Sequence, residues 1–246
     1  MTQTPTLPQI LLLPGNMCDA RLWQGGGGII ERMIGTYASS VSIVDFEHDA
    51  SIEAMAQRAL ARCEDEIVPI GFSMGGIVAL EIARRASRRI KALGLIDTTS
   101  HADTRGPERL RQQENIRQGQ LARVVTEELK PNYLAPCNAK NGLLLTLLTD
   151  MALNLGPEIF IAQSEALRTR ADLTPLVNKI EVPVFLACGM HDTLCPPDLH
   201  RDMAAMIAKA HLHIVEDAGH ILPLEQPAAL ARLLSDFLAS ALGPKP

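Results

Sequence analysis

The chain has 246 residues, and its 23 Lys and Arg against 28 Asp and Glu give a formal net charge of −5 at pH 7. This acidic balance gives no electrostatic reason to expect a nucleic-acid partner. The length and the shares of hydrophobic (47%) and charged (21%) residues are those of one large globular domain with room for an insertion.

The residue pattern gives no sign of a membrane or secreted protein. No apolar run is expected to reach the roughly 20 residues of a membrane span, and the opening MTQTPTLPQ lacks the charged and apolar regions of a signal peptide. The five cysteines are odd in number and contain no Cys-Xaa-Xaa-Cys pair, which argues against a disulfide framework or a zinc ribbon. We therefore expect a cytoplasmic protein that acts on a small molecule, and the oligomeric state stays open.

Short apolar runs alternate with segments of helical periodicity along most of the chain. Strands are predicted over 9–13, 41–45, 67–70, 92–96, 182–188 and 212–215, and helices over 51–63, 77–86, 198–208 and 227–241. This alternation predicts an α/β fold with a mostly parallel sheet of about six strands and helices on both faces. Ser51 is the expected N-cap of the first of these helices. Pro69 cannot donate to a strand ladder, so its strand is expected to be irregular there or to start late.

The segment 101–172 breaks the alternation. It has no clear strand pattern and is predicted to form about four helices, with breaks near Gly119, 131–138 and Gly156-Pro157. We interpret it as a helical cap that covers the site and is inserted into a core formed by 1–100 and 173–246. The low aromatic content (3%) and the aliphatic stretch 143–148 point to an aliphatic-lined pocket, although such a stretch is also typical of the cap's own core.

The sequence Gly71-Phe72-Ser73-Met74-Gly75 lies between a predicted strand and a predicted helix. This order is typical of a nucleophile elbow, where glycines make room for a sharp turn that exposes the serine hydroxyl. The amide of Met74 then lies at a helix N-terminus, where developing negative charge is favoured. Ser73 is therefore the expected nucleophile.

A nucleophilic serine needs a base, and the base needs an acid that orients it. Asp192 follows one predicted strand and His220 follows the next, so both can lie at the same edge of a parallel sheet as Ser73. Asp97 also follows a predicted strand and is the alternative acid. The chain order Ser, Asp, His is the one found in α/β-hydrolases.

Five segments together resemble the motifs of α/β-hydrolase-fold enzymes, in particular the small, cap-bearing bacterial serine hydrolases. They are LLLPGNMCDARLW (11–23), GFSMGGIVALEIA (71–83), ALGLIDTTS (92–100), IEVPVFLACGMHDTLCPPD (180–198) and AGHILPLEQPAALARLLSDFL (218–238). The resemblance implies a catalytic triad of Ser73, Asp192 and His220. It favours Asp192 over Asp97 because Gly-Xaa-Xaa-Asp after the later strand is the commoner pattern.

The resemblance also implies an oxyanion hole made by two backbone amides, that of Met74 and that of a residue just after Gly15. By analogy this residue is Asn16, with Met17 as the alternative. Most relatives have His-Gly where this chain has Pro14-Gly15, so the loop is expected to be stiffer here.

We therefore expect hydrolysis of a small carboxylic ester, lactone or thioester through an acyl-enzyme, without a cofactor or a metal. Serine at the elbow argues against the haloalkane dehalogenases and epoxide hydrolases, which use aspartate there. Carbon–carbon bond hydrolysis and perhydrolysis use the same triad and stay open. A non-catalytic ligand-binding member of the fold is the alternative from another class.

Three further patterns receive structural interpretations. The glycines 25–28 are followed by two isoleucines rather than Lys-Ser/Thr, so they indicate a weak helix start and not a phosphate loop. His211 and His213 share a face of a predicted strand, but no third residue has suitable spacing for a metal. Cys18 is interpreted as a small buried hydrophobic residue.

Overall fold

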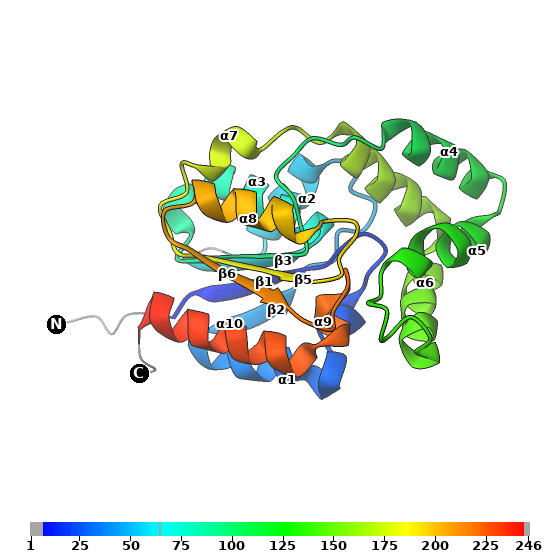
Figure 1. Ribbon diagram of the computed structural model, residues 1–246. Coiled ribbons are helices and arrows are strands. Elements are labelled where there is room, and N and C mark those ends of the chain that lie inside the picture. Colours follow the sequence, from blue (N-terminus) through cyan, green and yellow to red (C-terminus); the bar gives the residue numbers. More distant parts are fainter. Residues whose placement is uncertain (1–6, 64, 244–246) are drawn as a thin grey trace.

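Six parallel strands form one sheet in the computed structural model, which describes residues 7–63 and 65–243 (Figure 1). The order across the sheet is β2-β1-β3-β4-β5-β6. The strands are β1 Gln9–Leu13, β2 Ser40–Ile43, β3 Ile67–Phe72, β4 Leu93–Ile96, β5 Val184–Gly189 and β6 Ala210–Val215. The predicted fold class and strand number are confirmed, with strand ends that shift by at most two residues. The expectation of no signal peptide falls mainly on residues 1–6, outside the described residues.

Helices cover both faces of the sheet, as predicted (Figure 1). One face carries α1 Gly25–Ile34 and α10 Pro227–Leu242, and the other carries α2 Ile52–Leu60, α3 Met74–Ala86 and α8 Pro197–Met206, with the short α7 Thr174–Val177 beside α3. Alternate residues of β1 serve the two apolar cores, Ile10 and Leu12 one of them and Leu11 and Leu13 the other.

The starts of two helices illustrate how individual residues determine where a helix begins. Ser51 caps α2 as predicted, because its hydroxyl accepts from the amide of Ala54 at 3.1 Å. The glycines 25–28 lie at the start of α1, as expected of a weak helix start. Gly26, Gly27 and Gly28 adopt left-handed φ angles of 59°, 71° and 74°, so the regular helix begins after them.

Pro69 lies inside β3, which neither starts late nor ends there. β3 pairs with β1 through Pro69, which lies opposite Leu11. On the other side, an isolated bridge joins Ile67 to Ile90, and the ladder with β4 resumes only at Ile70. Alternate residues of a strand face the same neighbour, and the Ile67 carbonyl accepts from Lys91 on the β4 side. The missing amide of Pro69 therefore coincides with the gap in that ladder.

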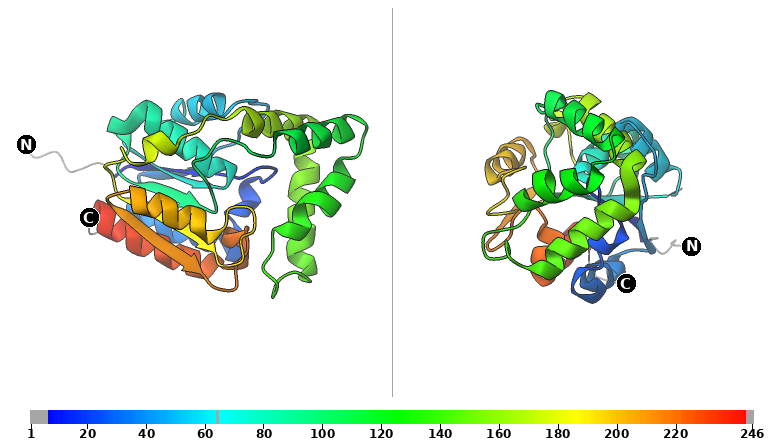
Figure 2. Two further views of the ribbon diagram at one scale, coloured as in Figure 1. Left: turned by 45° about the horizontal axis from the view of Figure 1, so that its top comes forward. Right: turned by 90° about the vertical axis from the view of Figure 1, so that its right-hand side faces the viewer.

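The segment 101–172 is helical and lies beyond the carboxyl ends of the strands (Figures 1 and 2). It contains α4 Gly106–Arg117, α5 Leu121–Arg123, a π-helical turn Val124–Leu129, a 3-10 turn Lys130–Asn132 and α6 Gly142–Thr169. Its helices break near the predicted positions. The division of the chain into a core and a cap with these boundaries stays a prediction.

Helix α6 is bent sharply in the middle (Figure 2). Gly156, before Pro157, has φ 84° and ψ 177°, which are not helical. Among the described residues, α6 is the one helix long and apolar enough to cross a membrane, contrary to the expectation that no such run exists. Core helices of soluble proteins can be equally long and apolar. Each half of α6 is shorter than the roughly 20 residues of a membrane span. The bend thus argues against a membrane-crossing role.

Candidate active site

Ser73 lies between β3 and α3, where the chain turns too sharply for side chains at two neighbouring positions. A Cβ atom on Gly71 would lie 2.1 Å from the carbonyl oxygen of Gly75, and one on Gly75 would lie 2.1 Å from that of Leu13. Ser73 itself has φ 51° and ψ −115°, which few L-residues adopt. The hydroxyl of Thr98 donates to the Ser73 carbonyl at 2.7 Å and helps to hold this strained residue.

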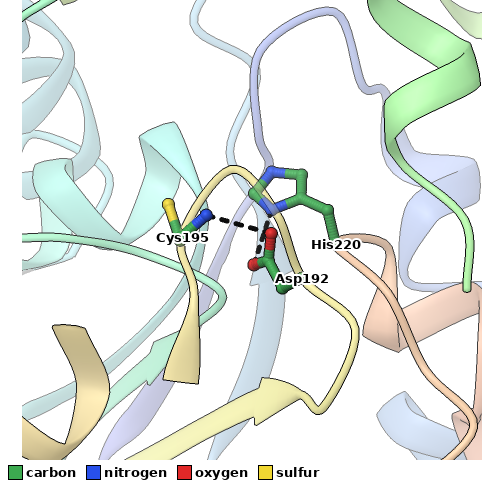
Figure 3. A group of neighbouring side chains, drawn as sticks. All are labelled: Asp192, Cys195 and His220. Carbon is green, nitrogen blue, oxygen red and sulfur yellow. Dashed lines mark hydrogen bonds and ion pairs between the residues drawn. The ribbon is translucent and has the colours of Figure 1, made fainter. Parts of the chain in front are cut away.

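The structure brings Ser73, His220 and Asp192 into one hydrogen-bonded row. His220 Nε2 lies 3.0 Å from the Ser73 hydroxyl oxygen. On the other side of the ring, His220 Nδ1 lies 2.9 Å from Asp192 Oδ2, a contact drawn in Figure 3. The three residues follow β3, β5 and β6, so the parallel sheet delivers them to the same edge. The backbone amide of His220 donates to the carbonyl of Tyr133 at 2.8 Å, which ties the base to the helical segment.

Asp192 is the charged member of the row. Its Oδ1 accepts from the amide of Leu194 at 2.8 Å and from that of Cys195 at 2.9 Å, the second of which is drawn in Figure 3. Burial raises the pKa of Asp192, but His220 and the two amides outweigh burial and leave the pKa below its usual value. The carboxylate is therefore ionised and acts only as an acceptor, which orients the Nδ1–H of His220 toward it.

Asp97, the alternative acid, has a different environment. It is fully buried, its Oδ1 accepts from the amide of Gly189 at 2.9 Å, and its Oδ2 has no partner among the described residues. Burial first, and then the charge of Asp192, raise the pKa of Asp97 well above its usual value. Two adjacent buried carboxyl groups cannot both ionise easily, so a proton resides more readily on Asp97 than on Asp192.

The two possible second oxyanion donors also differ. The amide of Met17 is engaged, because it donates to Gln163 Oε1 on α6 at 2.8 Å. Asn16 lines the pocket, and its amide makes no hydrogen bond within the described residues. Its side-chain Oδ1 is buried and also lacks a partner there. The geometry therefore leaves the Asn16 amide, together with that of Met74, available to an oxyanion.

A pocket of about 300 Å³ opens above Ser73 and His220. The segment 101–172 supplies much of its wall, including Arg105, Arg109, Gln112, Glu128, Leu129 and Tyr133. No residue of the stretch 143–148 lines this pocket. Leu144, Leu147 and Leu148 pack in or against the apolar core instead, which confirms the alternative interpretation of this stretch as core; the suggestion that it lines the pocket is wrong.

Asp192, Cys195 and His220 form the only described group of three potential metal ligands, with donor atoms within 4.8 Å of one another (Figure 3). The donor atoms do not fit a metal well. Asp192 and His220 already bind each other, and burial raises the pKa of the Cys195 thiol well above its usual value, whereas a thiol ligand must be deprotonated. His211 and His213 are not part of any such group.

Cys18 is buried as expected, and burial raises the pKa of its thiol to about 11. All five cysteines are free. The sequence did not single out the charged residues of the pocket wall, among them Arg109 and Arg170, or the anchor Gln163. Two arginines that lie far apart in the chain leave no local pattern that could have indicated them.

The sequence of this chain is similar to those of known proteins. A family model described as the alpha/beta hydrolase family matches residues 10–233. A pimeloyl-[acyl-carrier protein] methyl ester esterase of Neisseria meningitidis serogroup A is 28% identical over 204 residues, which cover 80% of this chain and 65% of that protein. The serogroup B protein of the same name is 29% identical over 206 residues, which cover 80% of this chain and 78% of that protein. The matched region thus spans just under two thirds of the first relative.

The fold comparison agrees with these relatives. The structure of a thermophilic esterase from Thermogutta terrifontis with bound malate is similar with a TM-score of 0.84 and 25% identity, covering 97% of this chain and 92% of that one.

Proposed function

We propose that this chain cleaves a small carboxylic ester through a serine acyl-enzyme. The chain belongs to the α/β hydrolase family, and it is a hydrolase of ester bonds like the esterases it resembles. The observation that carries the proposal is the row of hydrogen bonds from Ser73 through His220 to Asp192, 3.0 and 2.9 Å long. A non-catalytic ligand-binding protein would have no need for a serine in a strained turn next to a buried base.

In the first half of the reaction, the hydroxyl oxygen of Ser73 attacks the ester carbonyl while His220 Nε2 takes its proton. The amides of Met74 and Asn16 stabilise the negative oxygen of the tetrahedral intermediate. His220 then gives its proton to the leaving alcohol, and the acyl group stays on Ser73. Asp192 stabilises the imidazolium and holds its tautomer throughout.

In the second half, a water molecule attacks the acyl-enzyme and loses its proton to His220. The collapse of the second tetrahedral intermediate returns that proton to the Ser73 oxygen and releases the carboxylic acid. Every step uses groups of this chain and water, so the proposal includes no cofactor and no metal.

The two esterases of Neisseria meningitidis are named for a methyl ester, which supports an ester as the bond that is cleaved. Their names place that ester on an acyl group held by a carrier protein, so the small substrate proposed here rests on the pocket, which fits a short molecule better than a long lipid. We also propose that the substrate is a small molecule and that the protein acts in the cytoplasm.

The test combines labelling with turnover. The parent protein should take up one fluorophosphonate label on Ser73 and hydrolyse p-nitrophenyl esters of short acids. Ser73→Ala should lose the label and lower kcat by on the order of 10⁶ for a good ester. Stoichiometric labelling of Ser73→Ala, or an unlabelled parent without esterase activity, would overturn the proposal. Thermal melts of both proteins control for folding.

A further inference from the structure

The pocket wall formed by the helical segment carries an excess of positive charge. Arg109 on α4 and Arg170 just after α6 both line the pocket, and their side chains are only 14% and 8% exposed. Both bind the same carboxylate oxygen, Asp103 Oδ1, at 3.1 and 3.0 Å. One carboxylate thus serves two guanidinium groups, and one positive charge remains without a carboxylate of its own.

The other charged residues of the wall do not offset this excess. Arg105 is paired with Glu108 at 2.8 Å. Glu128 is bound by two arginines, Arg111 and Arg123, and so adds no free negative charge to the pocket. The local balance is therefore positive although the whole chain is acidic.

The two arginines differ in how many of their donors are engaged. Arg170 donates to Asp103 and also to the carbonyl groups of His101, Leu167 and Ala102, so it acts as a clamp between segments. Arg109 donates only through Nε within the described residues. Its two terminal nitrogens have no partner there, and together they form the planar fork that binds a carboxylate through two hydrogen bonds.

We propose that Arg109, supported by Arg170, forms an anion subsite, and that the physiological ester carries a carboxylate that binds there while Ser73 attacks the ester group. This inference deepens the proposed function and names its substrate class as a monoester of a short dicarboxylic acid. The pocket of about 300 Å³ contains both Ser73 and Arg109, so one small molecule reaches both.

The test compares substrates that differ in charge and hardly in shape. Monomethyl esters of unbranched dicarboxylic acids of graded length are compared with the corresponding methyl ester primary amides, with methanol release as the readout at pH 7.5. For the best length, the parent should prefer the acid by about 10- to 100-fold in kcat/KM, mainly through KM, as expected for a hydrogen-bonded charge pair. Equal rates for acid and amide would refute the subsite.

Variants locate the preference. Arg109→Met should abolish the acid preference by lowering kcat/KM for the acid far more than for the amide, and Arg109→Lys should retain part of the preference. Arg117→Met is the matched control, because Arg117 lies on the same helix with a side chain 52% exposed and does not line the pocket. It should behave like the parent. If Arg109→Met fails to fold, the acid-to-amide ratio of the parent and of Arg109→Lys still decides the question.

A binding measurement separates this inference from the proposed hydrolysis. Calorimetry with Ser73→Ala should show that the intact monoester binds more tightly than its amide, without any need for turnover. Hydrolysis of acid and amide at equal rates would leave the esterase standing and refute the subsite. Preferential binding of the acid without hydrolysis in the parent would support the subsite and refute the esterase. Equal binding of the two ligands would refute the subsite in either case.

Discussion

Asp192→Asn tests which carboxyl group orients the base, and the structure gives the physical reason for the expected loss. Asp192 Oδ1 is held by two backbone amides, so an asparagine would keep its oxygen there and turn its NH₂ group toward His220 Nδ1. His220 would then have to carry its proton on Nε2, facing Ser73, and could not accept the serine proton. A loss of roughly 10⁴ in kcat is expected, equivalent to about 5 kcal/mol of transition-state stabilisation.

Asp97→Asn is the matched control for this prediction. The raised pKa of Asp97 favours its neutral form, and its Oδ1 accepts from the Gly189 amide, so an asparagine reproduces the shape of that form and its hydrogen bond. We expect a loss of less than about 10-fold, well below the effect of the wrong tautomer. The assay is kcat for the best of the p-nitrophenyl esters of short acids, with thermal melts to establish that both variants fold. A folded Asp97→Asn that loses as much as Asp192→Asn would refute the reasoning.

Three further predictions concern other parts of the site. Asn16→Pro removes the backbone amide and should lower kcat by at least the roughly 10²–10³-fold of a lost oxyanion donor, whereas Asn16→Ala keeps the amide and should lower kcat much less. Equal activity of a folded Asn16→Pro and the parent would point to another donor. Burial lowers the pKa of His200 to about 4, below its unfolded value of about 6.5, so the neutral form contributes stability above pH 6.5 that is lost as the pH falls toward 4. His200→Gln keeps an acceptor for the Thr98 amide and, in denaturant titrations, should lose about 3 kcal/mol less than the parent between pH 7 and pH 4; equal losses would contradict this. Leu129→Ala enlarges the pocket and should shift the preferred acyl length in kcat/KM, whereas Leu144→Ala, outside the pocket, should not; the reverse result would contradict the lining described above.

The elbow was predictable because its requirements are local. A side chain at Gly71 or Gly75 would clash with backbone atoms a few residues away or on the adjacent strand, so both positions require glycine. The pattern also occurs between a strand and a helix. The order of elements likewise follows from apolar periodicity, so the parallel sheet and the strand ends that carry Asp192 and His220 could be anticipated.

The choice between Asp192 and Asp97 is not local. Both follow strands of the same sheet, and the residues alone give no distance to His220. What separates them is the turn after β5, where the amides of Leu194 and Cys195 hold Asp192 in place beside the imidazole. A hydrogen bond between residues 28 positions apart depends on the register of two strands, which the sequence pattern leaves open.

The pocket wall was the least predictable part. Arg109 and Arg170 meet at Asp103 only because α4 and the second half of α6 pack side by side. The bend at Gly156 sets the direction of that second half, and its angle follows from tertiary packing rather than from composition. For the same reason the leucines of the first half turn to the apolar core and away from the site.

The parallel sheet also makes activity a late event in folding. Ser73 and His220 are 147 positions apart, and His220 follows β6, an edge strand that pairs only with β5. Parallel pairing has to close long loops before its contacts form, which slows it. The amide of His220 is held by Tyr133 of the helical segment, so the base is positioned only when both parts of the molecule have docked. On dilution from denaturant, the helical circular dichroism signal should therefore return before esterase activity does. The rate at which activity recovers then measures the last docking step.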